Sequence, residues 1–216
     1  SARDGAEAPL ARQDLPYIGG FILAGGVLAP LLLFMGLRAI TASSASMLLN
    51  FELVFTSFIA VTVFGEHGGK RFWTSAALIT VGACVLSLDG SGVGFAPGSG
   101  LVLGAGFFWA VDNHLTARVS IKDPVTIGVI KGLTGGAVNC AAALYFYGGR
   151  PPLLPALAAL ALGVVSYGLS LVAWILAMRE LGASRAGAFF GAYPFIGAVL
   201  GDAVSGEPVT GRGLAG

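Results

Sequence analysis

Long apolar stretches alternate with short polar connections along most of the chain. Each stretch is close to the about 20 residues that a helix needs to cross a bilayer, and the connections are rich in Gly, Pro, Ser and charged residues. No connection is long enough to hold a separate soluble domain. The pattern predicts an all-α polytopic transmembrane helix bundle of about seven spans, at residues 17–37, 44–64, 72–88, 99–117, 125–147, 154–178 and 186–205.

The composition also indicates a membrane protein. Hydrophobic residues make up 56% of the 216 residues and charged residues 11%, whereas a soluble domain has about 25% charged residues. The net charge of +1 and the scattered basic residues argue against a nucleic-acid partner. Cys84 and Cys140 lie in apolar stretches and predict no disulfide framework, and we expect no metal and no cofactor. His114 is a lone histidine, for which we expect hydrogen-bonded packing, with a proton relay as the alternative.

Basic residues are distributed unevenly between the two ends of the predicted spans. Lys131 lies inside a span. Of the others, eight lie on one side (Arg3, Arg12, Lys70, Arg71, Arg118, Lys122, Arg179 and Arg185) and three on the other (Arg38, Arg150 and Arg212). Because positively charged loops stay in the cytoplasm, the split predicts a cytoplasmic N-terminus. We expect a multi-pass protein of the bacterial cytoplasmic (inner) membrane.

An internal repeat organises the chain. An offset of 141 positions lays residues 37–71 over residues 178–212 and gives eight identities in 35 columns, including the Gly-Glu pairs at Gly65 and Gly206. The two copies are five spans apart, so they cross the membrane in opposite directions, which is typical of carriers. We expect two parts, residues 1–90 with three spans and residues 99–216 with four. Two similar helices that end in a common cap are the alternative explanation.

Several of these stretches resemble a known family. SASMLLNFELVFTSFIAVTVFGE and LGASRAGAFFGAYPFIGAVLGDAVSGEP resemble the repeat unit of EamA-type carriers in the drug/metabolite transporter superfamily, and FFWAVDNHLTARVS with DPVTIGVIKGLTGGAVN resembles the start of the family's second half. The resemblance implies ten helices in two inverted halves, of which this chain lacks the first two and the last. The family favours a proline in mid-helix after Glu; Pro194 keeps it, but Leu53 replaces it in the first copy, so the resemblance gives no reason to expect a kink there. Because the chain opens with Ser1, shows no signal peptide and stops soon after Gly206, we expect both ends to be cut.

Glu52 lies near the middle of a predicted span. A carboxylate at that depth costs at least about 2.5 kcal/mol, so the side chain should face the bundle interior and be protonated or paired. One interpretation is a site for a coupling proton or a substrate amine, and the other is a protonated structural Glu. The offset places Tyr193 at the position equivalent to Glu52.

Asp112 and Lys131 occupy matching depths on two consecutive spans. They lie at equal distances from the turn at residues 121–122, so we expect them to form a buried ion pair. The alternatives are that either group also receives a charged part of a solute, or that Lys131 reaches the interface.

Polar and aromatic side chains share helical faces in the later spans. Trp109, Asp112 and Asn113 have the three- and four-residue spacing of one face, as do Tyr167, Ser170 and Trp174, and Lys131 with Asn139. The glycines at 128, 132 and 136 have the spacing that allows helices to approach closely. The candidate substrate-binding and translocation residues are Asn50, Glu52, Trp109, Asp112, Asn113, Lys131, Asn139, Tyr167, Trp174 and Tyr193.

These features favour one function. They predict an integral membrane carrier that moves a small organic metabolite or drug-like solute by alternating access, with proton coupling as an option, and not an enzyme. Its partners would be the solute and the lipid bilayer, and the sequence leaves the oligomeric state open. The alternatives are an intramembrane enzyme and a membrane subunit that does not itself transport.

Overall fold

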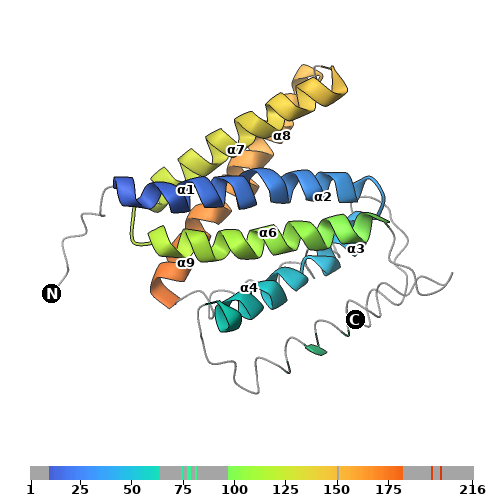
Figure 1. Ribbon diagram of the computed structural model, residues 1–216. Helices are drawn as coiled ribbons and strands as arrows, with labels where there is room; N and C mark the ends of the chain where they lie inside the picture. Colours follow the sequence, from blue (N-terminus) through green and yellow to red (C-terminus); the bar gives the residue numbers. More distant parts are fainter. Residues whose placement is uncertain are drawn as a thin grey trace.

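The computed structural model describes residues 10–63, 97–149 and 151–181, together with the isolated positions 74, 77, 78, 81, 196 and 200. The regular secondary structure of these residues is helical (Figure 1). Five of the seven predicted spans are therefore present as helices. The predicted spans at 72–88 and 186–205, and with them Tyr193 and the second copy of the sequence repeat, lie outside the described residues.

The first span is one continuous helical rod that changes its winding in the middle. It consists of a 3₁₀ turn (Arg12–Asp14), α1 (Leu15–Phe21), a π-helical segment (Ile22–Leu28) and α2 (Ala29–Leu37). We call Ile22–Leu28 the first π segment. Pro30 is the second residue after this segment and has no N–H, so it cannot complete the backbone hydrogen bonds there.

The second span is broken near its centre. Thr41 caps α3 (Ala42–Leu48) because its side chain accepts a hydrogen bond from Ser44 N, and α4 (Phe51–Thr62) follows after two residues. Around this break the backbone bonds shorten to the i−3 type, as from Glu52 N to Leu49 O (2.9 Å). The break lies directly before Glu52 and needs no proline at residue 53.

A polar helix and an apolar helix form the next hairpin. α6 (Pro97–Val119) runs between the first span and α4, as Figure 1 shows. α7 (Pro124–Tyr147) begins at Asp123, whose carboxylate accepts from Val125 N and Thr126 N, and it ends at Gly148 in the left-handed conformation.

The last described span repeats the winding of the first. It consists of α8 (Leu153–Leu162), a second π segment (Gly163–Leu169) and α9 (Ser170–Leu181). Adding the 141-residue offset of the sequence repeat to the bounds of the first π segment gives 22 + 141 = 163 and 28 + 141 = 169, the bounds of the second. The tip of the α7–α8 hairpin extends away from the rest of the bundle (Figure 1).

Four described helical stretches are long and apolar enough to cross a membrane, by length and composition: Arg12–Leu37, Ser44–Thr62, Pro124–Phe146 and Leu153–Glu180. α6 is as long, but it carries Asp112, Asn113 and His114 and packs among the other helices. The predicted class, a polytopic helical membrane bundle, is therefore confirmed. The polar residues of α6, which the sequence analysis placed on helical faces, contact α4 and α7.

Two apolar clusters pack against different ends of α6. One contains Val102 with Ala45, Leu48 and Leu49 of the second span. The other contains Val119 together with residues from the first span, α7 and α9, namely Ile18, Phe21, Ile127, Ile175 and Met178. The polar part of α6 lies between these two clusters.

Candidate functional site

A cavity of about 190 Å³ opens beside the polar part of α6. Its walls come from the broken second span, α6, α7 and the last span. Charged, polar and aromatic side chains converge there, which is the usual lining of a small-molecule site. The lining residues are Leu49, Glu52, Trp109, Asp112, Asn113, Thr116, Lys131, Tyr167, Ser170, Leu171 and Trp174.

An ion pair joins α6 to α7 in the cavity wall. Lys131 Nζ donates to Asp112 Oδ2, and the two side chains are only 3% and 5% exposed. Thr116 Oγ1 donates to the other oxygen of the carboxylate (3.1 Å), and Lys131 Nζ also lies 5.7 Å from the centre of the Phe21 ring. The ion pair expected from the matching depths is confirmed. The alternative in which Lys131 reaches the interface is wrong, because its side chain is buried against these groups.

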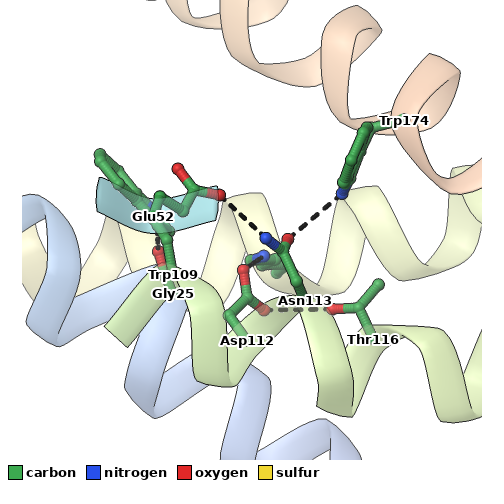
Figure 2. A network of polar contacts seen from close by, with 8 residues as sticks. Gly25, Glu52, Trp109, Asp112, Asn113, Thr116 and Trp174 are labelled. Atoms are coloured by element: carbon green, nitrogen blue, oxygen red, sulfur yellow. Dashed lines mark hydrogen bonds and ion pairs between the residues drawn. The ribbon is translucent and has the colours of Figure 1, made fainter. Parts of the chain in front are cut away.

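A directed chain of hydrogen bonds joins α9, α6 and α4 across the cavity (Figure 2). Trp174 Nε1 donates to Asn113 Oδ1 (3.2 Å), and Asn113 Nδ2 donates to Glu52 Oε1 (2.8 Å). Because an indole N–H can only donate, it fixes the Asn113 amide with its NH₂ group toward Glu52. Glu52 is 6% exposed, so its carboxyl group is held at the cavity wall rather than toward lipid.

The first π segment presents two backbone carbonyls to neighbouring helices. Gly26 O would bond to residue 30 in an α-helix and Gly25 O would do so in a π-helix, but Pro30 has no N–H. Trp109 Nε1 donates to Gly25 O (3.3 Å; Figure 2), and Asn139 Nδ2 donates to Gly26 O (2.8 Å). Two polar side chains thereby replace the backbone donor, as a membrane span requires.

The structure separates the predicted site residues into those at the cavity and those beside it. Asn139 caps Gly26 and is outside the described cavity lining, and Asn50 is buried at the break between α3 and α4. Tyr193 lies outside the described residues. His114 Nε2 bonds to Thr56 O (2.8 Å), which matches the expected packing role. The remaining predicted site residues line the cavity.

The glycines that allow close helix packing differ from those predicted. Gly135, rather than Gly132 or Gly136, lies against the first π segment: a Cβ atom there would come within 2.6 Å of Gly26 O. In the described part of the chain, a Cβ atom at Gly132 or Gly136 would meet nothing within 4 Å. The reason is that Gly135 is four residues from Lys131 and from Asn139, and therefore shares the face of α7 that these polar side chains turn inward.

A polar cluster that the sequence interpretation missed holds the α6–α7 turn. Arg179 donates to Ser120 O (2.9 Å) and Lys122 O (2.5 Å), and Lys122 Nζ lies 3.3 Å from Asp14 Oδ2. We call Asp14, Ser120, Lys122 and Arg179 the turn cluster. The basic residues were interpreted only as topology signals; the acidic residue at the start of an apolar span was the available clue.

One layer of apolar side chains separates the cavity from the turn cluster. Along α6, Thr116 lines the cavity, Val119 is in the apolar layer and Ser120 belongs to the turn cluster. Along α9, Trp174, Ile175 and Arg179 have the same three places in the same order. The cavity is thus covered at the α6–α7 end by an apolar layer and then by charged groups. No group of three or more His, Cys, Asp or Glu side chains that could hold a metal occurs within the described residues.

Comparisons with known proteins agree with this architecture. The profile of the EamA-like transporter family matches residues 5–88 and 96–216. An uncharacterized transporter of Methanothermobacter thermautotrophicus is 32% identical over 210 residues, which cover 94% of this chain and 61% of the relative. This chain therefore spans about three fifths of the length of that relative.

A solved crystal structure has the same fold. It superposes with a TM-score of 0.71 at 19% sequence identity, over 94% of this chain and 72% of the other. At this identity the likeness concerns the fold alone. The family match over most of the chain, the apolar helices and the buried polar cavity lead to one conclusion: the chain is a multi-pass membrane protein that belongs to the EamA-like transporter family.

Proposed function

We propose that this protein is a carrier that moves a small organic solute across the cytoplasmic membrane by alternating access, with the cavity beside α6 as its solute site. The observation that carries the proposal is the convergence of Glu52, Asp112 and Lys131 on one cavity inside a bundle of apolar helices. Ionisable groups are costly at this depth, and they mark solute or ion pathways in membrane proteins.

The repeated winding of the first and last described spans supports a carrier built from inverted repeats. Backbone geometry at Ile22–Leu28 and at Gly163–Leu169 follows the same 141-residue offset as the identities in the sequence. We propose that residues 1–90 and 99–216 belong to two oppositely oriented halves. Carriers of this kind bind their solutes between the halves, near the bilayer midplane.

In the proposed cycle the conformation described here is closed at the α6–α7 end. The apolar layer and the turn cluster cover the cavity on that side, and opening would separate Arg179 from the turn and Lys122 from Asp14. We place this end in the bacterial cytoplasm, and the N-terminus with it, because eight of the eleven basic residues outside the spans lie on this side.

Proton coupling is assigned in this proposal to Glu52. Its carboxyl group is buried, lines the cavity and accepts from Asn113, so both solute and proton binding can act on one group. Among the lining groups, Asp112 is already engaged by Lys131 and Thr116.

The test is solute flux in proteoliposomes that contain the purified protein. A screen of small metabolites should identify at least one solute that accumulates in response to a pH gradient. Glu52→Gln should abolish the pH-driven accumulation and keep solute exchange, while Glu180→Gln, an exposed carboxylate at the end of α9, should change neither. Absence of solute-specific flux would favour a membrane subunit that does not itself transport. Cleavage of a lipid or peptide would favour an intramembrane enzyme.

Membrane orientation is tested separately by cysteine labelling in intact cells. On a cysteine-free background, Arg150→Cys should react with an impermeant thiol reagent and Lys122→Cys should not. The reverse pattern would place the α6–α7 turn outside the cell.

A further inference from the structure

We propose that Trp109 is a positioning residue that couples the occupancy of the cavity to the helical winding of the first span. Its indole N–H and the backbone N–H of Ala29 compete for one acceptor, Gly25 O, and each holds a different winding of residues 22–28. This inference rests on the carrier function proposed above and deepens it, because it names how a solute in the cavity acts on the closed end.

The first π segment lies directly behind the cavity wall. Residues 22–28 are not among the described lining residues, but Gly25 contacts two residues that are. Trp109 Nε1 donates to Gly25 O (3.3 Å; Figure 2), and a Cβ atom on Gly25 would overlap the carboxylate of Asp112. A movement of the Trp109 ring therefore reaches the first span without an intermediate helix.

The backbone supplies an alternative donor for Gly25 O. In the conformation described here Ala29 N–H donates to Ala24 O, five residues earlier, which is the π pattern. In an α-helix the same N–H donates to the carbonyl four residues earlier, which is Gly25 O. In the π winding Gly25 O would need an N–H at Pro30, and the indole of Trp109 takes its place. The segment thus has two windings, π with the indole bound and α with the indole released.

The bond from Trp109 is the more easily released of the two that hold this segment. Its length of 3.3 Å exceeds the usual N–H···O range of about 2.7–3.2 Å, whereas Asn139 Nδ2 lies 2.8 Å from Gly26 O. Trp109 is also the one of these two donors that lines the described cavity. A solute that displaces the Trp109 ring leaves Gly25 O without its donor. Because an unpaired carbonyl is costly inside a membrane, the segment then changes to the α winding, in which Ala29 N–H is the donor.

This change moves the groups that close the cavity. The first span carries Asp14 of the turn cluster, and Ile18 and Phe21 of the apolar cluster around Val119, all before the π segment. After the segment, α2 is held against the start of α6, where a Cβ atom at Gly36 would come within 2.7 Å of the Val102 side chain. Since an α turn contains fewer residues than a π turn, the change rotates the first part of the span against the second and lengthens the span. Solute in the cavity thereby acts on the α6–α7 end.

The experiment measures a distance within the first span by electron paramagnetic resonance. Spin labels are attached to p-acetylphenylalanine introduced at Leu15 and Phe34, which are 60% and 66% exposed and lie on either side of the segment. Conversion of the seven residues from π to α should lengthen this distance by about 2 Å, since an α-helix rises more per residue than the wider π-helix.

Two tryptophan variants isolate the indole N–H without any added solute. Trp109→Phe keeps an aromatic ring but removes the donor to Gly25 O, so it should give the longer distance in the empty protein. Trp174→Phe is the matched control, because it makes the same change at another cavity residue, whose N–H donates to Asn113 and not to the first span. It should keep the shorter distance.

A tethered probe then tests the effect of filling the cavity. On a background without Cys84 and Cys140, Ser170→Cys places a thiol in the cavity wall. Reaction with benzyl methanethiosulfonate attaches a benzyl group there and should give the longer distance in most molecules. The small adduct of methyl methanethiosulfonate should keep the shorter distance. This measurement also decides the matter if Trp109→Phe does not fold.

Three outcomes would overturn the proposed role of Trp109: the shorter distance in the benzyl adduct, the shorter distance in a folded Trp109→Phe variant, or equal lengthening in Trp174→Phe. Failure of this role is distinguishable from failure of the carrier function. Solute flux in proteoliposomes with an unchanged distance removes the role of Trp109 alone, whereas the longer distance without flux of any solute removes the carrier function alone.

Discussion

The two π segments have the same helical winding, but the first is partly buried in the bundle and the second is exposed in the described part of it. In the first, Ala24, Gly25 and Gly26 are buried against α6 and α7. In the second, no residue is buried, and Val164 and Val165 are 65% and 63% exposed in the described part of the bundle. The carbonyls at equivalent positions are nevertheless capped by side chains in both.

The source of the donors differs between the two segments. Gly25 O and Gly26 O accept from Trp109 and Asn139, which belong to other helices. Ser166 O and Tyr167 O, 141 positions later, both accept from the hydroxyl of Ser170 in their own span, at 2.5 and 3.1 Å. The first span is therefore bonded to its neighbours at this level and the last span supplies its own donor, so a repeated backbone geometry can have unrelated side-chain chemistry.

The largest expected effect concerns the ion pair that packs against the first segment. Asp112→Asn or Lys131→Met alone should lower the free energy of unfolding in detergent by about 3–5 kcal/mol, because each leaves a buried charge unpaired. The double variant should be closer to the unmodified protein than either single variant. Additive losses in this double-mutant cycle would show that the two groups act independently.

A smaller effect is expected where the first segment touches Asp112. A Cβ atom at Gly25 would lie 2.1 Å from Asp112 Oδ2, so Gly25→Ala should lower the free energy of unfolding by about 3 kcal/mol. Ser166→Ala, at the equivalent position of the second segment, removes only an intrahelical hydrogen bond to Leu162 O and should cost less than about 1 kcal/mol. Equal losses in a thermal unfolding assay would contradict the difference between the two segments.

The smallest effect tests why the carbonyls of the first segment lack a backbone donor. Asn139→Leu removes the donor to Gly26 O and should cost about 1–2 kcal/mol of unfolding free energy. In a Pro30→Ala background the cost should fall by at least half, because Ala restores a backbone N–H at residue 30. Ser170→Ala is the matched change in the second segment. Leu171 occupies the position equivalent to Pro30 and has an N–H, so Ser170→Ala should cost less unfolding free energy than Asn139→Leu. If Asn139→Leu costs as much unfolding free energy in the Pro30→Ala background, the role of Asn139 does not depend on the N–H that the proline lacks.

The sequence predicted those features that depend on spacing along a single helix or hairpin. Equal distances from the turn were enough to pair Asp112 with Lys131, and three- and four-residue spacing was enough to place Trp109 with Asn113 on one face. Pro30 could also have been used, since a proline in a span always frees a carbonyl four residues earlier. The donor to that carbonyl, Asn139, is 113 positions from Gly26, so its identification required the tertiary structure.

Features that depend on competing local geometries were not predictable in this way. The break before Glu52 occurs with Leu at residue 53, so a proline is not its cause; short i−3 bonds at Asn50 and Glu52 produce it. The two π segments have unrelated sequences, ILAGGVL and GVVSYGL, and only the offset relates them. Glycine spacing on α7 was compatible with several faces, and the polar neighbours of Gly135 decided among them.

The measurement that tests the central claim most directly is the accessibility of the cavity from the two sides of the membrane. Ser170 lines the cavity, so Ser170→Cys, on a background without Cys84 and Cys140, places one thiol there in oriented proteoliposomes. If the cavity is the solute site of an alternating-access carrier, an impermeant thiol reagent should label residue 170 from either side, and a transported solute should slow labelling from both. Labelling from one side only, unaffected by any transported solute, would contradict the account.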